Sequence, residues 1–316
     1  MRSDTLSHHL DAALQKHGSR TALEDASYRL TYADLDALSL TWAQRFRALR
    51  LKEGDRIVTL TGNSLWSAVA LLATLRCGAV EVALHPSDAW SHILGILQEV
   101  KPALVIVPSE VMKGRLHDQG LAFPVHVAGT GVLAEHPDTS LERPPETARA
   151  DTTALIHYTS GSTGRPKGVM LSHGALAATL PDGEHLARIR NLRLLLGIPL
   201  AHAYGKTMLI EYLLAGACIV LERAFLAPAH ICQSIQRHRA SAIEAPPSVY
   251  EMLIKDDKFI AQTMPALEYL AMNSAKPRED LLLELRSRFP RAEIVVRCGI
   301  SEIAGPLCRL AWRGPD

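Results

Sequence analysis

The sequence has few cysteines and no run of one charge, and both shortages exclude classes of protein. Five cysteines are scattered through 316 residues with no Cys-x-x-Cys spacing, which disfavours a disulfide framework and a zinc site. The formal net charge is only +1, and there is no basic run of the kind that binds nucleic acid or an anionic membrane. We therefore expect a cytoplasmic protein with reduced thiols and no nucleic-acid partner.

Long apolar runs are also absent. The two longest apolar stretches, 65–84 and 194–221, are interrupted by charged residues such as Arg76 and Lys206, whereas a membrane helix needs about 20 consecutive apolar residues. Residues 1–15 carry acids and histidines in place of a charged head and an apolar core, which is unlike a signal peptide. We therefore expect no transmembrane segment.

What the sequence does contain is a regular alternation of short apolar runs and amphipathic segments. Residues 34–50, for example, place Leu35, Leu38 and Trp42 at the three- and four-residue spacings of a helix. Strands are predicted at 56–60, 80–84, 103–107, 124–128, 154–158, 192–198, 217–221, 242–245, 267–272 and 293–297. Helices are predicted at 34–50, 65–77, 90–100, 110–118, 174–180, 205–214, 228–238, 248–255 and 278–288. This alternation is typical of parallel sheets flanked by helices.

Residues 129–151 interrupt the alternation with prolines, glycines and mixed charges. We interpret them as a surface connection between two α/β layers. The expected fold is α/β, with two stacked, predominantly parallel sheet layers flanked by helices. The expected division is a first α/β subdomain at 1–150 and a second at 151–316.

The most informative stretch is Tyr158–Val169, which holds four aliphatic hydroxyls, three glycines, a proline and two cations. Glycines let backbone N–H groups approach an anion, hydroxyls donate hydrogen bonds and lysine adds positive charge. Because it lies between the predicted strand 154–158 and helix 174–180, we expect a phosphate-binding loop joining a strand to a helix. It is not a Walker A loop, since no hydroxyl follows Lys167. Composition alone leaves an ordinary surface loop as the alternative.

The residue order of this loop resembles the signature of the adenylate-forming superfamily: acyl- and aryl-CoA synthetases, adenylation domains of peptide synthetases and firefly-type luciferases. Four other segments resemble family motifs in the same order: Leu30–Leu35 (LTYADL), Leu75–Pro86 (LRCGAVEVALHP), Pro199–Gly205 (PLAHAYG) and Glu293–Glu302 (EIVVRCGISE). The resemblance implies ATP-dependent activation of a carboxylic acid as an acyl-adenylate, with release of pyrophosphate. The acceptor would be the thiol of CoA or of a phosphopantetheinyl carrier protein.

The resemblance also implies roles for individual residues, all within the expected second subdomain. Those implied to bind the phosphates are Thr159, Ser160, Gly161, Ser162, Thr163, Gly164, Lys167 and Ser301. Those implied to surround the adenine are Asn273, Ser274, Ala275, Cys298 and Gly299. Glu302 would hold Mg²⁺, His202 would stand where acid and nucleotide meet, and Tyr204 would line the acid pocket. We expect Lys167, His202 and Glu302 to be the catalytic residues. Taken singly, His202 and Tyr204 could equally be packing residues and Glu302 a solvated acid.

The sequence departs from the family pattern at several points. Cys298 stands where the family usually has an aromatic residue against the adenine, and Asn273–Pro277 replaces a glycine-rich turn; we expect Asn273 to adopt the left-handed conformation that glycine would use. No acid occurs between Tyr204 and Glu211, which favours an aryl or fatty acid over an amino acid.

The family also continues past the segment matching Cys308 with a β-barrel subdomain and a small lysine-bearing domain. No such continuation is present by Asp316, and we expect no terminal element in residues 312–316. We therefore expect a truncated or proteolytic, weakly active or inactive fragment, or a half-protein that needs a partner. The alternative is a nucleotide- or acyl-binding module of the same fold that has lost catalysis.

Overall fold

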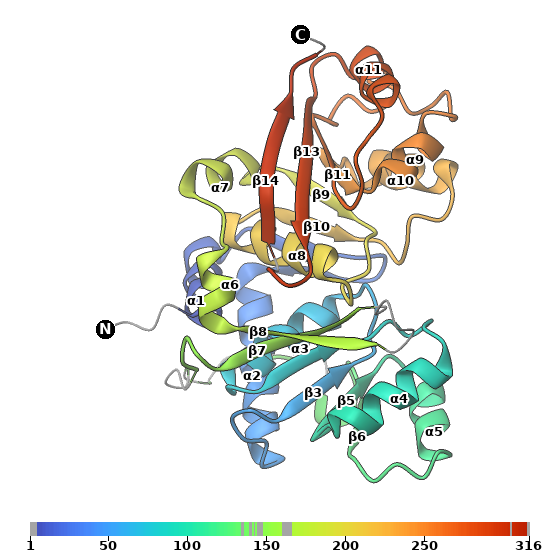
Figure 1. Ribbon diagram of the computed structural model, residues 1–316. Helices are drawn as coiled ribbons and strands as arrows, with labels where there is room; N and C mark the ends of the chain where they lie inside the picture. The colour runs from blue at the N-terminus through green and yellow to red at the C-terminus, as the bar shows by residue number, and fades with distance from the viewer. Residues whose placement is uncertain are drawn as a thin grey trace.

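The computed structural model describes residues 5–133, 136–138, 141, 143, 148–159, 166–303 and 305–314. These residues form two β-sheets flanked by helices, one of six strands and one of eight (Figure 1). The α/β class and the two sheet layers predicted from the alternation are confirmed. No helix among the described residues is long and apolar enough to cross a bilayer.

The six-stranded sheet is parallel except at one edge, where β7 and β8 are antiparallel. Its strands in spatial order are β6 (Val125–Val127), β5 (Leu104–Val107), β3 (Arg56–Thr59), β4 (Val80–Ala83), β7 (Thr153–Thr159) and β8 (Lys167–Ser172). The helices of this region are α2 (Tyr32–Ala48), α3 (Leu65–Arg76), α4 (Trp90–Val100) and α5 (Glu110–His117), with a 3₁₀ turn η1 (Gly131–Leu133).

The eight-stranded sheet is parallel in its centre and antiparallel at both edges. Its strands in spatial order are β14 (Gly305–Trp312), β13 (Glu293–Ile300), β12 (Tyr269–Met272), β11 (Ala242–Ala245), β9 (Arg193–Leu196), β10 (Cys218–Leu221), β1 (Thr21–Glu24) and β2 (Arg29–Thr31). The remaining helices are α1 (Leu6–His17), α6 (His173–Ala178), α7 (Gly183–Ile189), α8 (Ala203–Ala215), α9 (Pro228–His238), α10 (Pro247–Leu253) and α11 (Glu279–Arg288).

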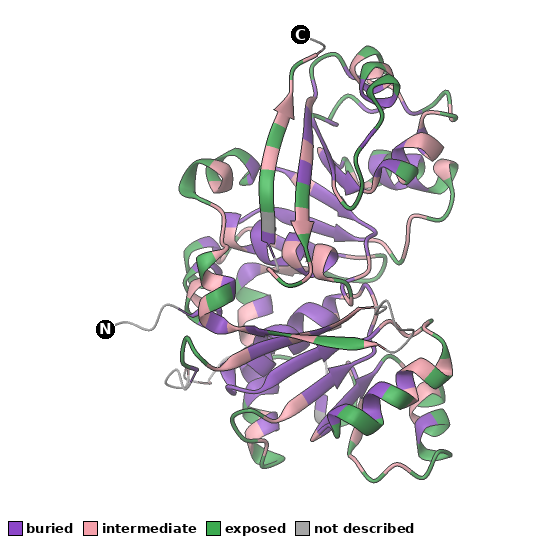
Figure 2. Cartoon of the chain, in the orientation of Figure 1, coloured by how far each residue is buried: buried purple, intermediate pink, exposed green. Residues whose placement is uncertain are grey.

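One continuous apolar core lies between the two sheets. Side chains alternate across each strand, so Ile57 and Leu194 belong to this central core while their neighbours Val58 and Leu195 face outer clusters. Helices α1, α2, α3 and α8 contribute to the central core, whereas α4 and α9 contribute to outer ones. Every residue of α3 except Trp66 is buried, and Figure 2 shows the same concentration of burial in the strands and central helices. The helices between the sheets thus hold the two layers together.

Asn63 adds a polar link between the layers. Its side-chain amide donates to the carbonyls of Ile198 and Glu222, both at 2.9 Å, and its Oδ1 accepts from the backbone N–H of Leu200 at 2.8 Å. Asn63 precedes α3, whereas its partners follow β9 and β10. Its side chain therefore fixes the segment that leads into α8.

The strands at the edges of the two sheets differ from the prediction. Lys167–Ser172 pairs antiparallel with β7, with Lys167 opposite Thr159, so the hydroxyl-rich segment joins two antiparallel strands and not a strand to a helix. The strand β14, which pairs along β13 in an antiparallel direction, was not predicted either. The prediction also missed α1, β1, β2 and α7.

The sheets interleave along the chain. The early strands β1 and β2 belong to the eight-stranded sheet, whereas β7 and β8, which follow residue 150, belong to the six-stranded sheet. The boundary between the sheets therefore does not coincide with the predicted division between 1–150 and 151–316.

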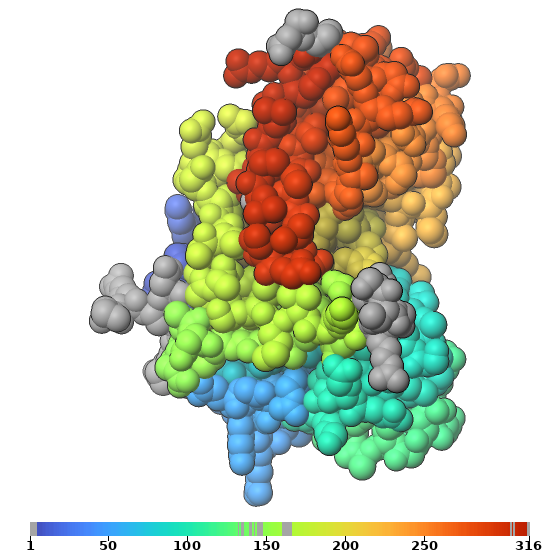
Figure 3. All heavy atoms as spheres, in the orientation of Figure 1, coloured from blue at the N-terminus to red at the C-terminus, as the bar shows by residue number. Residues whose placement is uncertain are grey.

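Figure 3 shows the start of β14 near α6, where a Cβ on Gly305 would lie 2.9 Å from Cβ of Thr179.

Candidate functional site

Two neighbouring cavities lie where strands of both sheets end. The larger, about 390 Å³ and here called the interlayer cavity, is lined by Ala83, Leu84, Asp88, His92, His157, Tyr158, Thr159, Ala201, His202, Ala203, Tyr204, Ser274 and Ser301. The smaller, about 240 Å³ and here called the Arg297 cavity, is lined by Ala203, Tyr204, Thr207, Met208, Asn273, Ser274, Arg297, Gly299, Ile300, Ser301 and Gly305. In open α/β sheets, ligands bind outside the carboxyl ends of strands, and Ala83, Thr159 and Ile300 are such ends.

Several residues singled out in the sequence meet at these cavities. Thr159 and His202 line the interlayer cavity, Asn273 and Gly299 line the Arg297 cavity, and Tyr204, Ser274 and Ser301 line both. Lys167, Ala275, Cys298 and Glu302 are exposed and line neither. Ser160, Gly161, Ser162, Thr163 and Gly164 lie outside the described residues.

The segment that carries His202 has a fixed backbone. The His202 N–H donates to the carbonyl of Pro199, and the His202 carbonyl accepts from Lys206 N–H, both at 3.0 Å. A Cβ on Gly205 would lie 2.3 Å from the Pro199 carbonyl oxygen, so only glycine fits there. His202 is thereby held, exposed, immediately before α8.

The turn after β12 contains no glycine in residues 273–277, yet one of its residues has a left-handed backbone conformation. Ser274, and not Asn273, has the positive φ of 78°. The Asn273 Oδ1 accepts from the Ser274 N–H at 2.7 Å, which stabilises the turn locally. The prediction that Asn273 would take the left-handed conformation was therefore wrong by one residue.

The region around Glu302 offers no preformed metal cage. Among the described residues, no group of three His, Cys, Asp or Glu side chains is placed to hold a metal ion. Mg²⁺ commonly uses one or two carboxylates together with substrate phosphates and water. Glu302 is exposed and directly follows Ser301, which lines both cavities. One exposed carboxylate in this position fits that kind of coordination.

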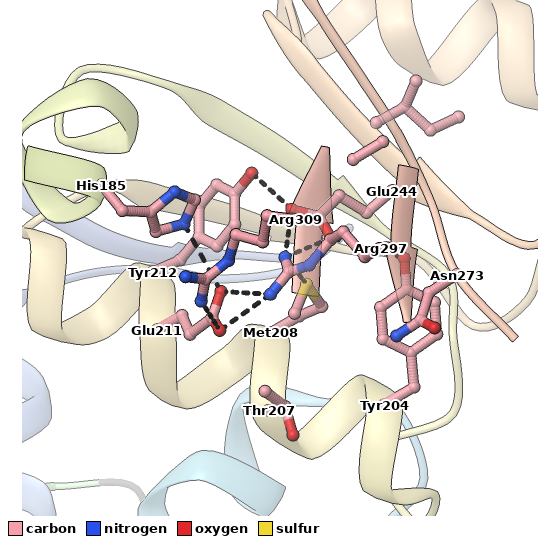
Figure 4. Close-up of polar contacts among 12 residues, drawn as sticks. His185, Tyr204, Thr207, Met208, Glu211, Tyr212, Glu244, Asn273, Arg297 and Arg309 are labelled. Carbon is pink, nitrogen blue, oxygen red and sulfur yellow. Dashed lines mark hydrogen bonds and ion pairs between the residues drawn. The ribbon is translucent and has the colours of Figure 1, made fainter. Parts of the chain in front are cut away.

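The sequence interpretation missed a buried ion-pair network behind the Arg297 cavity (Figure 4). The Arg297 Nη1 donates to both carboxylate oxygens of Glu244 at 3.1 and 2.9 Å, and Nη2 donates to both oxygens of Glu211 at 2.8 Å. Arg309 Nη2 donates to the same Glu211 at 2.7 Å. The side chains of Arg297 and Glu244 are 0% exposed. Because these residues come from β13, α8, β11 and β14, no local sequence pattern could have revealed the network.

The two carboxylates of the network differ in pKa. Burial raises the pKa of Glu211, but Arg297 and then His185 and Arg309 outweigh it and lower the pKa to about 2. For Glu244, burial outweighs the nearby Arg297 and raises the pKa. Glu244 also accepts a hydrogen bond from Tyr212 Oη at 3.0 Å, so its carboxyl group is hydrogen-bonded by a tyrosine hydroxyl as well as by Arg297.

Two histidines give the interlayer cavity unused hydrogen-bonding atoms. His157 is buried on β7, and burial, followed by the charges of Lys206 and His202, lowers its pKa to about 3. His157 is therefore neutral at physiological pH. Within the described part of the chain, His157 Nδ1 and His92 Nε2 are buried without a hydrogen-bond partner.

Comparison with known proteins agrees with this geometry. The model of the AMP-binding enzyme family matches residues 10–316, and the chain belongs to that family. Feruloyl-CoA synthase of Amycolatopsis sp is 29% identical over 270 residues, covering 83% of this chain and 52% of the relative. 4-Coumarate–CoA ligase 5 of Oryza sativa subsp. japonica is 29% identical over 299 residues, with 88% and 53% covered. Fumosorinone synthetase of Cordyceps fumosorosea is 28% identical over 298 residues, covering 92% of this chain but 7% of the relative.

Solved structures show the same fold. Apo MatB from Rhodopseudomonas palustris superposes with a TM-score of 0.82 at 23% identity, covering 99% of this chain and 63% of that one. The N-terminal subdomain of Klebsiella oxytoca NpsA, in complex with 3-hydroxybenzoyl-AMSN, gives 0.83 at 19% identity, with 98% and 76% covered. The chain thus has the fold of the N-terminal domain of these proteins, and it spans about half the length of the two CoA-ligase relatives.

Proposed function

We propose that this chain activates a carboxylic acid with ATP. The carboxylate oxygen attacks the α-phosphorus, the bond to the departing pyrophosphate breaks, and an acyl-adenylate remains. The observation that supports this best is the convergence of Thr159, His202 and Ser301, from three separate segments, on one cavity. The acyl group then passes to the thiol of CoA or of a carrier-protein phosphopantetheine arm in the cytoplasm, where the five free cysteines would stay reduced.

Both reactants are anions, so the side chains serve to position them and to offset their charge. In this proposal Thr159 and Lys167, together with residues 160–164, bind the β- and γ-phosphates. Ser301, at the edge shared by both cavities, meets the α-phosphate, and His202 orients the acid against it. Glu302 would hold Mg²⁺, which when bound would offset phosphate charge.

The nucleoside end of ATP lies along the turn after β12 and the end of β13 in this proposal. The residues concerned are Asn273, Ser274, Ala275, Cys298 and Gly299. Cys298 is exposed on β13 and presents a thiol where an aromatic ring would stack on adenine. We therefore expect modest ATP affinity.

The Arg297 cavity supports an aryl acid as substrate. Its volume of about 240 Å³ lies below the roughly 300–1,000 Å³ that is usual for drug-sized ligands, which suits a compact acid better than a long chain. Two relatives are named for aryl acids, as feruloyl-CoA synthase and 4-coumarate–CoA ligase. The acid's carboxylate would lie at the shared edge, near Ser301 and His202.

A binding module that has lost catalysis is the second candidate, and the thiol at Cys298 is the observation that favours it. Such a module would keep the cavities and bind a nucleotide or an acyl ligand without forming an adenylate. The two functions differ in whether pyrophosphate is released and can be exchanged back into ATP.

ATP–pyrophosphate exchange with a panel of aromatic and short-chain acids separates these candidates. It should be run on residues 1–316 and on any longer native form, since the chain covers only part of its relatives. We expect acid-dependent exchange that falls about 100-fold in Lys167→Ala and Glu302→Gln, the scale for loss of one charge-stabilising group. Lys255→Ala, at an exposed position that lines neither cavity, should match the wild type. If no acid supports exchange in either form, and Glu302→Gln leaves ATP binding unchanged, the ligase proposal is wrong.

A further inference from the structure

Two exposed cysteines lie directly opposite each other on neighbouring strands. Cys298 on β13 and Cys308 on β14 are partners in the antiparallel ladder, and both side chains are exposed. The other cysteines, Cys77, Cys218 and Cys232, are buried. Residues that face one another across antiparallel strands have Cβ atoms about 4.5–5.5 Å apart. The ladder therefore places two accessible thiols side by side.

The ion pairs next to the cysteines establish which way the thiols face. The adjacent cross-strand pair is Arg297 and Arg309, and both guanidinium groups donate to Glu211 on one face of the sheet (Figure 4). Side chains alternate along a strand, so Cys298 and Cys308 lie together on the opposite face. The shared bond to Glu211 also holds the register that keeps the two thiols opposite each other.

The ladder geometry is within reach of a disulfide. A disulfide usually joins Cα atoms about 4.4–6.8 Å apart, and facing residues of antiparallel strands have Cα atoms about 4.5 or 5.5 Å apart. The Cβ atoms need to approach by about 1 Å. The register shifts directly after Cys298, because Gly299 pairs with Pro306 and leaves Leu307 as an extra residue. Such a bulge disrupts the ladder locally, which gives Cys308 the freedom to make this approach.

We propose that Cys298 and Cys308 form a site of reversible oxidation, where a small-molecule disulfide converts the two thiols into a bridge across the strands. One cysteine thiolate attacks the small disulfide, releases one small thiol and leaves a mixed disulfide; the other thiolate then attacks the protein sulfur and releases the second small thiol. The protein thiols lose two electrons and two protons, and the sulfur–sulfur bond of the oxidant is reduced.

An excess of small thiol reverses the reaction, since exposed disulfides are readily reduced. In a reducing cytoplasm the bridge is therefore transient, as cytosolic disulfides usually are.

The bridge weakens nucleotide binding. This part rests on the proposed function, which places adenine along the turn after β12 and the end of β13. Because β12 and β14 lie on opposite sides of β13, bonding to Cys308 turns the Cys298 sulfur toward β14 and away from that turn. A contact between sulfur and an aromatic ring is favourable, and its loss should raise the ATP dissociation constant about fivefold.

Peptide mass spectrometry tests the bridge in the longest native form of the protein. The reduced protein is incubated with oxidised glutathione, unfolded and alkylated, and then digested with trypsin, which releases residues 298–309 with both cysteines and no other. We expect this peptide to be unalkylated and lighter than the reduced peptide by two hydrogen atoms. The buried cysteines should all be alkylated, and excess reduced glutathione should restore both thiols.

Variants separate the bridge from oxidation of single cysteines. Cys308→Ser leaves Cys298 without a partner, so residues 298–309 should carry one glutathione and no bridge. Cys232→Ser, which removes a buried thiol, should form the bridge as the wild type does. Calorimetry should show the fivefold rise in the ATP dissociation constant on oxidation and its reversal on reduction. The double variant Cys298→Ser with Cys308→Ser should bind ATP equally before and after the oxidant.

Two alkylated or two glutathionylated cysteines in residues 298–309 would overturn the inference, and so would a disulfide to a second copy of the chain; each of these results leaves the ligase proposal standing. A bridge that leaves the ATP dissociation constant unchanged would overturn its effect on the nucleotide site. Failure of the reduced protein to bind ATP would overturn the proposed function and that effect, but not the bridge, which is measured without nucleotide.

Discussion

The ammonium of Lys206 lies 2.8 Å from Oε1 of Glu81, and both side chains are only 1% exposed. Lys206 is on α8 and Glu81 on β4, so this buried ion pair joins the helix behind His202 to the six-stranded sheet. Removing one partner of a buried pair leaves an uncompensated charge and typically costs about 3–5 kcal/mol, whereas replacing both by apolar residues is often neutral.

We therefore expect Lys206→Met to lower the free energy of unfolding by about 3–5 kcal/mol, measured by urea denaturation. The double variant Lys206→Met with Glu81→Leu should recover most of that loss. Lys255→Met, at an exposed site, is the control for losing a lysine. A double variant as unstable as the single one would show that the pair itself, and not an orphaned carboxylate, carries the stability.

Asn63→Ala should destabilise the protein by about 1–3 kcal/mol, because the backbone groups of Ile198, Leu200 and Glu222 lose the hydrogen bonds that Asn63 provides. It should also lower kcat more than stability alone explains, since Leu200 lies two residues before His202. Urea denaturation and exchange kinetics are the measurements. Asn191→Ala, which removes an exposed amide, serves as the control, and equal effects of the two variants would contradict this account.

His157 should make the fold acid-sensitive. Burial and neighbouring charge lower its pKa from 6.5 to about 3, so the stabilisation from a neutral His157 is fully present above pH 6.5 and declines as pH falls toward 3. At pH 5 the expected loss relative to pH 7 is about 2 kcal/mol. His157→Gln should remove that part of the pH dependence in urea denaturation, whereas His117→Gln, at an exposed site, should not. An unchanged pH dependence in His157→Gln would refute this assignment.

Cys298→Tyr should strengthen ATP binding. A ring stacked on adenine is worth about 1 kcal/mol, so the ATP dissociation constant should fall about fivefold, measured by calorimetry. Cys308→Tyr places the same ring on the neighbouring strand, since Cys308 is the cross-strand partner of Cys298, and should have a smaller effect. Equal gains at both positions would mean that the adenine does not lie against Cys298.

Local pattern predicted most of the buried elements, although it missed α1 and β1, and it did not predict the antiparallel edge strands. The bounds predicted for α4 and α9 agree with the structure, because their apolar spacing reflects one buried face. β8 was not predicted since only one of its residues, Leu171, is buried. An edge strand of this kind carries no clear alternation for sequence analysis to detect.

For the candidate site, the sequence predicted the segments that line the interlayer cavity but not the ion-pair network around Arg297. Motif order located the segments of Thr159, His202 and Ser301, which the fold does bring to one cavity. The Arg297 network could not be predicted, because its hydrogen bonds join residues 53 and 86 positions apart. The sequence shows only isolated charges; the pairing depends on tertiary packing between β13, β11 and α8.

The central claim, attack of a carboxylate on the α-phosphate of ATP, is tested most directly by isotope transfer. The longest native form would be incubated with an ¹⁸O-carboxylate acid, ATP, Mg²⁺ and CoA or another thiol, and the nucleotide product analysed by mass spectrometry. Because the carboxylate oxygen that bonds to phosphorus stays with it when the thiol takes the acyl group, the account predicts AMP carrying one ¹⁸O, together with pyrophosphate. Unlabelled AMP, or ADP and phosphate in place of AMP and pyrophosphate, would contradict it.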